Sequence, residues 1–308
     1  MDEANKHPIV SVIVPVYNGA GIIEKCLEAL DAQTYPPEKL EIIVADNGSD
    51  DGTVEIINRF SMVGARYVSP LLVEEREIQS SYAARNKALE VANGDIIAFT
   101  DADCTPSPDW VTSGVNCILE GTDMVGGRVE FVFSEKRGWF ERFDALYHMN
   151  QKDTIPRGMA ATANLFVKRI VAEKTGHFRH DLISGGDSEW VKRAIGQGFK
   201  LGYCEEAVVK HPTRVGRKAN VKKEARIGRG EGQISMQKAR RKWFEIIRII
   251  VKFPFDMTRY VWPVMKFAFQ GRIKFYEIFI LAPIAKYMFW VKRTAMIGYI
   301  LKTQTRNC

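Results

Sequence analysis

The sequence predicts an α/β fold with a mostly parallel β-sheet, followed by a basic α-helical C-terminal extension. Short β-branched runs alternate with segments of helical spacing over the first half of the chain. These runs are apolar at nearly every position, as strands buried on both faces are. Charge is divided unevenly, because residues 217–308 hold 21 Lys and Arg against 5 Asp and Glu, whereas residues 1–216 hold 23 against 32. An acidic α/β body therefore carries a basic extension.

Most predicted strands of the body end in a polar or glycine-containing loop. The predicted strands cover 9–18, the first part of 40–53, 65–70, 95–103 and 123–133, with short strands within 199–214. Predicted helices cover 21–34, 80–94, the second part of 160–176 and 185–198, and another begins at "VEIINRF" (54–60). In parallel sheets ligands bind beyond the carboxyl ends of the strands. Tyr17, Asp46, Asp101 and Asp103 lie at such ends and are expected to converge on one crevice.

The pair Asp101 and Asp103 directly follows the apolar run "DIIAF". Like charges at short range raise each other's pKa, so a positive partner is expected nearby. If the strand continues to Asp103, both acids point into one crevice, because alternate strand residues share a face. Divalent cations prefer oxygen ligands and often keep substrate phosphates as further ligands. An Asp that only forms a turn or caps a helix is the simpler alternative.

Other phosphate-binding motifs are absent from the sequence. No G-x-x-x-x-G-K-[ST] occurs, and no G-x-G-x-x-G follows the first predicted strand, which argues against P-loop and dinucleotide-binding proteins. The polar start "MDEANKHP" lacks the features of a secretory signal, so a cytoplasmic location is expected. The five dispersed cysteines include no C-x-x-C pair, which predicts reduced thiols and no zinc site.

Five motifs occur in order along residues 9–214. They are "VSVIVPVYNGAGIIEKCLEAL", "EIIVADNGSDDGT", "ARNKALEVANGDIIAFTDADC", "GGDSEWVKRAIGQGFKL" and "AVVKHP". With them the chain resembles glycosyltransferase family 2, the A-type nucleotide-sugar transferases. The resemblance implies a Rossmann-like A-type catalytic domain over 1–213. It also implies inverting, metal-dependent transfer of a sugar from a nucleotide-diphosphate sugar, UDP-sugar being expected, to a hydroxyl of a glycan or lipid-linked acceptor in cell-surface polysaccharide synthesis.

The resemblance also implies roles for individual residues. Asp187 matches the catalytic base, and Asp103 and His211 match ligands of a divalent metal, Mn²⁺ or Mg²⁺. The residues implied in nucleotide-sugar binding are Pro15, Tyr17, Asp46, Arg85 and Asp101. Gly186 stands where the family usually has Glu, and Arg193 keeps the family's spacing after Asp187. Simpler alternatives remain open, since Asp187 could cap its helix, Arg85 could pair with a surface acid and His211 could be an ordinary loop residue.

The composition of the C-terminal third predicts a basic mobile segment with some helix over 214–240 and a helical extension over 241–308. Residues 243–253 form a basic amphipathic pattern, while Glu277, Pro283 and Lys286 interrupt the apolar run 275–291. A spanning helix needs about 20 mostly apolar residues, so the run suits a helix in the membrane plane. We expect peripheral docking on the anionic cytoplasmic face of the membrane, where a polyprenyl-diphosphate-linked glycan serves as acceptor.

Other interpretations of the chain stay open at this point. The extension could be a solvated linker with a helical subdomain, or a homo-oligomer interface formed by its helices. No nucleic acid is expected as a partner, because the basic residues lack a recognisable nucleic-acid-binding fold. Rival functions are a non-catalytic sugar- or nucleic-acid-binding protein and a nucleotidyltransferase, which also uses paired acids and a metal.

Overall fold

The computed structural model describes residues 7–238, 247, 251, 258 and 261–303. The chain divides into two compact units, each with its own core. Unit 1 comprises Met1–Val132, Met149–Asp181 and Gly186–Pro212, and unit 2 comprises Phe133–His148, Leu182–Gly185 and Thr213–Cys308. The last boundary between the units lies between Pro212 and Thr213, and two earlier segments also belong to unit 2.

Unit 1 is built on an eight-stranded sheet in the order β3-β2-β1-β4-β7-β6-β8-β5. The strands are β1 (Val10–Val16), β2 (Leu40–Asp46), β3 (Leu71–Glu74), β4 (Ile96–Thr100), β5 (Thr105–Pro106), β6 (Met124–Val132), β7 (Asn164–Lys168) and β8 (Leu201–Pro212). β3, β2, β1 and β4 are parallel, as are β6 and β8, while β7 runs antiparallel to both β4 and β6. The structure confirms the predicted α/β fold with a mostly parallel sheet.

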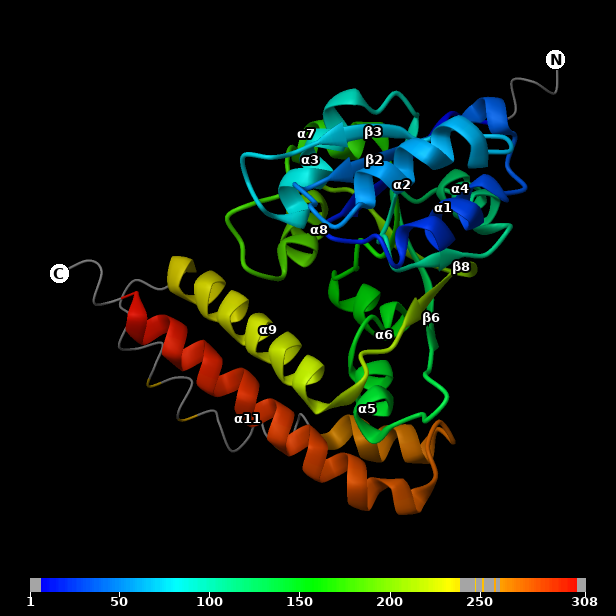
Figure 1. Cartoon of the computed structure of the whole chain (residues 1–308). Helices are drawn as coiled ribbons and strands as arrows, with labels where there is room; N and C mark the ends of the chain where they lie inside the picture. Colours follow the sequence, from blue (N-terminus) through cyan, green and yellow to red (C-terminus); the bar gives the residue numbers. More distant parts are fainter. Residues whose placement is uncertain (1–6, 239–246, 248–250, 252–257, 259–260, 304–308) are drawn as a thin grey trace. The chain divides into compact units, whose positions relative to one another are not determined.

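Helices cover both faces of this sheet (Figure 1). The helices of unit 1 are α1 (Ile23–Asp31), α2 (Thr53–Arg59), α3 (Ser81–Val91), α4 (Trp110–Leu119), α6 (Gln151–Thr154), α7 (Arg169–Thr175) and α8 (Gly186–Gly196). Alternate β1 residues, such as Val12 and Val14, join a core with α1, α2 and α4. On the other face Phe99 contacts Phe178 and Trp190, the latter from α8. Burial on both faces explains the continuous apolar character of the strands.

Two strand predictions differ from the structure. The third strand is β3 rather than 65–70, because the N–H groups of Arg66, Tyr67 and Val68 donate to the Asp31 carboxylate at 2.6–2.8 Å. These donors are therefore not available for a sheet ladder. In addition β4 ends at Thr100, so the two acids that follow lie in a turn and do not alternate along a strand.

The expectation of reduced thiols throughout is wrong for one pair. Cys117 on α4 and Cys204 on β8 form a disulfide, with their Cα atoms 6.2 Å apart. The residues are 87 positions apart in the sequence, and only the packing of α4 against β8 brings them together. Cys26 and Cys104 are free and buried, and Cys308 lies outside the described residues.

Unit 2 is helical and contains α5 (Trp139–Tyr147), α9 (Gly216–Lys238), helical residues 261–269 and α11 (Ile278–Lys302). α9 and α11 run side by side (Figure 1), and a Cβ at Gly228 would lie 2.0 Å from the Lys292 carbonyl oxygen. The stretch 214–240, for which the sequence predicts a mobile segment, therefore contains a 23-residue helix. The predicted helix 243–253 lies almost wholly outside the described residues. Among the helices that the structure describes, none has the length and apolar character needed to cross a membrane.

Candidate active site

The carboxyl ends of β2, β1 and β4 are neighbours in the sheet, and several predicted site residues follow them. Pro15 is buried within β1, one residue before its end, whereas Tyr17 just beyond the strand is 51% exposed. The loop after β1 is held by the loop after β2, because the N–H of Asn18 donates to Ser49 Oγ at 2.9 Å. The two loops therefore form one edge of the site.

Asp46 ends β2 and is fully buried. Its Oδ2 accepts the N–H groups of Gly48 and Ser49, both at 3.0 Å, while its buried Oδ1 has no hydrogen-bond partner. A buried carboxylate oxygen without a donor is unfavourable, so its site suits a ligand that brings an N–H or O–H group. The next residue, Asn47, donates to the carbonyl oxygens of Glu75 and Ile78 and holds the neighbouring loop.

Arg85 on α3 and Asp101 after β4 form an ion pair. Arg85 Nη2 lies 2.5 Å from Asp101 Oδ1, and the Arg85 side chain is only 4% exposed. Its buried Nε has no hydrogen-bond partner. The structure thus places the guanidinium in the site, and not on the surface with an unrelated acid. A buried guanidinium whose Nε–H has no hydrogen-bond partner is suited to bind an anionic ligand.

Asp103 lies close to His211, which comes from the distant strand β8. His211 Nε2 lies 3.5 Å from Asp103 Oδ1, and His211 Nδ1 lies 2.7 Å from the carbonyl oxygen of Pro212. Because a carbonyl oxygen only accepts hydrogen bonds, Nδ1 carries the proton. In the neutral ring Nε2 then presents its lone pair toward Asp103, which is the state of a metal-binding imidazole.

Cys104 is the third group near this pair, since its sulfur lies within 4.8 Å of the Asp103 and His211 ligand atoms. Burial raises the pKa of the Cys104 thiol well above its ordinary value, and the charges of Asp101 and Asp103 raise it further. Metals bind the thiolate form of cysteine. The raised pKa makes Cys104 a weaker candidate ligand than the Asp103 carboxylate and the His211 imidazole.

Asp187 lies in the first turn of α8, near the Arg85–Asp101 pair. Burial is the largest effect on the Asp187 carboxyl and raises its pKa, and the charge of Asp101 acts in the same direction. A hydrogen bond from the Ser188 N–H at 3.0 Å and the charge of Arg85 lower the pKa. The net shift is upward. Asp187, Arg85 and Asp101 thus share one electrostatic environment, although they come from three separate elements.

Tyr82 is a residue of this region that the sequence interpretation missed. Its hydroxyl oxygen accepts the N–H of Gly186, at the start of α8, at 2.9 Å. A Cβ at position 186 would lie 2.7–2.9 Å from atoms of the Tyr82 ring. The signal in the sequence that points to Tyr82 is Gly186, which stands where the family usually has Glu and leaves room for a large neighbouring side chain.

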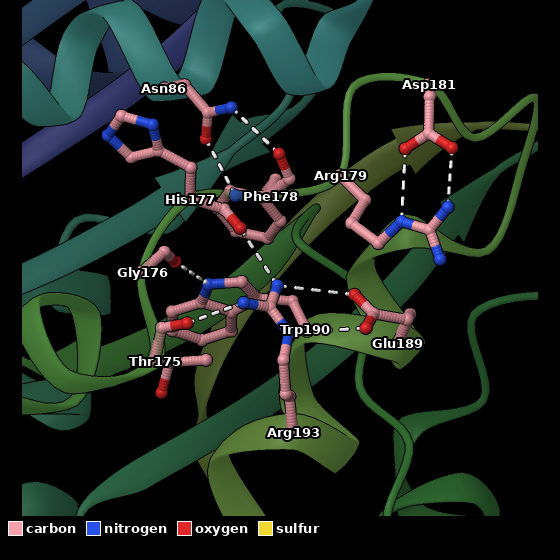
Figure 2. A network of polar contacts seen from close by, with 10 residues as sticks. All are labelled: Asn86, Thr175, Gly176, His177, Phe178, Arg179, Asp181, Glu189, Trp190 and Arg193. Atoms are coloured by element: carbon pink, nitrogen blue, oxygen red, sulfur yellow. Dashed lines mark hydrogen bonds and ion pairs between the residues drawn. The ribbon is translucent and has the colours of Figure 1, made fainter.

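The loop before α8 is fixed by the polar network in Figure 2. Arg193 donates to the carbonyl oxygens of Thr175 and His177 at 2.5 and 2.8 Å, and it also pairs with Glu189. Asn86 on α3 exchanges two hydrogen bonds with the backbone of Phe178, at 2.8 and 2.9 Å. The element that carries Asp187 is therefore tied to α3, which carries Arg85.

Comparisons with known proteins agree with this architecture. The family model "Glycosyl transferase family 2" matches residues 11–179. The glycosyltransferase AglE of Haloferax volcanii is 45% identical over 231 residues, which cover 74% of this chain and 75% of that protein. A dolichyl N-acetyl-α-D-glucosaminyl phosphate 3-β-D-2,3-diacetamido-2,3-dideoxy-β-D-glucuronosyltransferase of Methanococcus voltae is 25% identical over 264 residues, or 80% of this chain and 78% of that protein.

Solved structures share the fold at low sequence identity. The mannosyltransferase PcManGT of Pyrobaculum calidifontis, in complex with GDP-Man and Mn²⁺, has a TM-score of 0.61 at 20% identity, covering 96% of this chain and 89% of that one. TarS of S. aureus, in complex with UDP-GlcNAc, has a TM-score of 0.53 at 16% identity, covering 94% and 91%.

Proposed function

The chain belongs to glycosyltransferase family 2 and is a glycosyltransferase, and we propose that it is an inverting, metal-dependent enzyme that uses a nucleotide-diphosphate sugar. The sugar moves to a hydroxyl of a glycan or lipid-linked acceptor, in cell-surface polysaccharide synthesis. One observation carries this proposal: Asp187, with its raised pKa, interacts electrostatically with both members of the buried Arg85–Asp101 ion pair. The nucleotidyltransferase and binding-protein alternatives are not supported by the family.

Asp187 acts as the general base in this proposal. Its carboxylate accepts the proton of the acceptor hydroxyl as that oxygen attacks the anomeric carbon, and the bond to the diphosphate breaks on the opposite face. A carboxylate with a raised pKa is a stronger base than an ordinary surface Asp, which favours proton transfer near neutral pH. A single base without a second nucleophile corresponds to one displacement, and hence to inversion.

Asp103 and His211 fit a divalent cation, because the carboxylate Oδ1 and the imidazole Nε2 face each other across 3.5 Å. A cation bound there would offset the negative charge that develops on the leaving diphosphate. The mixed oxygen and nitrogen donors suit Mn²⁺ better than Mg²⁺, which strongly prefers oxygen ligands. Asp101, neutralised by Arg85, is assigned to the donor's ribose and phosphate region and not to the metal.

The donor's base is assigned to the loops after β1 and β2. The unpartnered Oδ1 of Asp46 accepts an N–H of the base, and exposed Tyr17 lies against the base, with Pro15 shaping the strand end. Uracil and guanine both offer an N–H donor, so this contact is compatible with UDP and with GDP donors. Of these two donor classes, we propose UDP-sugars.

The acceptor is proposed to be a polyprenyl-phosphate- or diphosphate-linked glycan at the cytoplasmic face of the membrane. The name of the Methanococcus voltae relative describes a dolichyl-phosphate-linked acceptor, and the basic C-terminal third of this chain suits an anionic surface. The enzyme would then be peripheral, with its helical extension against the membrane.

A donor screen tests this function. The full chain is incubated with a panel of UDP- and GDP-sugars and with Mn²⁺ or Mg²⁺, and release of the nucleoside diphosphate is measured. We expect release from one donor class, dependent on metal and reduced at least about 100-fold by Asp187→Ala or Asp103→Ala. Release that neither substitution alters would reject the proposed site.

A further inference from the structure

Exposed aromatic side chains are concentrated in one short part of unit 2. Among the described residues, eight aromatic side chains are more than half exposed, and six of them lie between residues 262 and 290. These six are Trp262, Phe269, Phe275, Tyr276, Phe279 and Trp290. The other two, Tyr17 and Tyr67, lie on separate loops of unit 1. A cluster of this kind on a surface marks an interaction site more often than scattered single residues do.

The centre of the cluster is the connection between helical residues 261–269 and α11. We call Phe269, Arg272, Lys274, Phe275, Tyr276 and Phe279 the aromatic tip. Phe279 is 82% exposed, and the rings of Phe269 and Phe275 contact each other at 5.7 Å. The tip therefore presents neighbouring apolar rings together with two cationic side chains.

The tip is held in this form by a filled core beneath it. Val264, Phe267 and Leu281 are buried there with residues of α5. Glu277 is 3% exposed, pairs with Arg142 and accepts the N–H of Lys274 at 2.9 Å, which caps the 3-10 turn Phe275–Glu277 directly before α11. Because the inner positions are already occupied, the exposed rings do not belong to the interior of this unit.

The charge of this region is one-sided. Residues 261–303 contain seven Lys and Arg and one acidic residue, the buried Glu277. The exposed surface of this stretch thus has cations and no carboxylates. In a symmetric dimer formed through this surface, the second copy would bring the same positive charge to the contact, so this pairing is opposed. A surface of anionic phospholipids matches both the cations and the rings, since aromatic side chains prefer the headgroup level of a bilayer.

We infer that the aromatic tip docks this enzyme on a bilayer of anionic lipids, with Phe275 and Phe279 entering the headgroup region and Arg272 and Lys274 contacting phosphates. Helical residues 261–269 and the start of α11 then lie at the membrane surface without crossing it. The inference rests on the proposed function in one respect: a lipid-linked acceptor explains why the enzyme should bind a membrane.

Flotation of the full chain tests the inference. Vesicles of phosphatidylglycerol and phosphatidylcholine are compared with vesicles of phosphatidylcholine alone. We expect the protein to float with the anionic vesicles, and the double variant Phe275→Ser/Phe279→Ser to need about tenfold more lipid for equal recovery. The matched control is Met62→Ser/Tyr67→Ser, which removes two side chains of unit 1 that are 84% and 58% exposed. This control should float like the unmodified chain.

Several results would overturn the inference. Equal flotation of the Phe275→Ser/Phe279→Ser variant and the unmodified chain would do so, as would equal losses in the variant and the control. Loss of dimers on a sizing column with unchanged flotation would instead assign the tip to a second copy. Donor turnover measured without vesicles is expected to be the same in all these proteins. A chain that floats but releases no nucleotide contradicts the proposed function and leaves the docking surface intact.

Discussion

The hydroxyl oxygen of Tyr82 accepts the backbone N–H of Gly186 at 2.9 Å, and its ring fills the space where a side chain at position 186 would stand. This contact joins α3 to the first turn of α8, which carries Asp187. Where the family usually has a glutamate, this chain has an aromatic ring from another helix. The position of the proposed base therefore depends on a pair of residues that are 104 positions apart.

Substitution of Gly186 by alanine should displace the start of α8. The new Cβ would lie 2.7–2.9 Å from three carbon atoms of the Tyr82 ring, so the helix or the ring must move. We expect kcat for transfer to fall about tenfold or more, since small misplacement of a catalytic group has a large effect on rate. Gly196→Ala, at the other end of α8, is the control, because its Cβ would meet nothing within 4 Å. Equal losses in both variants would contradict the role of the Tyr82–Gly186 contact.

Asp187→Asn should remove proton acceptance while preserving the shape of the side chain. We expect kcat to fall by about 10²–10⁴-fold. In the unmodified enzyme the carboxylate must be ionised, and burial raises its pKa, so kcat/KM should decrease on the acidic side at a pH above that of an ordinary Asp. The measurement is a pH profile of kcat/KM. An acidic limb that persists in Asp187→Asn would assign the titration to another group.

The substitution His211→Gln should lower the affinity of the enzyme for its metal ion. The imidazole Nε2 faces Asp103, and glutamine lacks an equally basic donor there. We expect the Mn²⁺ concentration for half-maximal activity to rise about 10–100-fold, with partial rescue at high Mn²⁺. His180→Gln, a change of an exposed histidine, is the control and should leave the metal requirement unchanged. An unaltered Mn²⁺ requirement in His211→Gln would remove His211 from the proposed metal site.

The substitution Asp46→Asn should weaken binding of the nucleotide, because it changes the group that faces the base. Oδ2 accepts two backbone N–H groups, so the asparagine oxygen must take that position and its NH₂ group must replace the unpartnered Oδ1. A donor then faces the N–H of the base. We expect the Kd for UDP or GDP, measured by calorimetry, to rise at least about tenfold. Unchanged affinity would place the base elsewhere.

The stability of unit 2 should depend on the ionisation of Glu141. Burial alone would raise its pKa, but hydrogen bonds from Thr213, Ser134 and the N–H of Gly138 outweigh this and lower the pKa to about 2. Since the folded pKa is below the unfolded value of about 4.3, the stabilisation is complete above pH ~4.3 and is lost as the pH falls toward about 2.

Urea unfolding of Glu141→Gln at pH 7 and at pH 2.5–3 checks this dependence. The variant should unfold at a lower urea concentration than the unmodified chain at pH 7, and the difference should shrink at the acidic pH. Glu173→Gln, at an exposed position of α7, is the control and should change little at either pH. A difference that does not change with pH would show that Glu141 does not contribute through its charge.

Much of the fold could be predicted because the relevant signals are local. The apolar runs of β1, β2 and β4 and the helical spacing of α1 and α8 each arise within one element. The prediction of a strand at 65–70 failed because a remote side chain, Asp31, takes up the backbone donors of that segment. The pairing of Cys117 with Cys204 likewise depends on packing between elements that are far apart in the sequence.

The order of the motifs determined the family, the positions of Asp46, Asp101 and Asp103 near strand ends, and Asp187 at the start of a helix. Only the tertiary structure decided what these groups contact: Arg85 pairs with Asp101, His211 turns its Nε2 toward Asp103, and Tyr82 takes the space beside Gly186. The physical reason is that strands and helices follow from short-range pattern, whereas ion pairs, tautomers and raised pKa values follow from burial and from neighbours that only folding brings together.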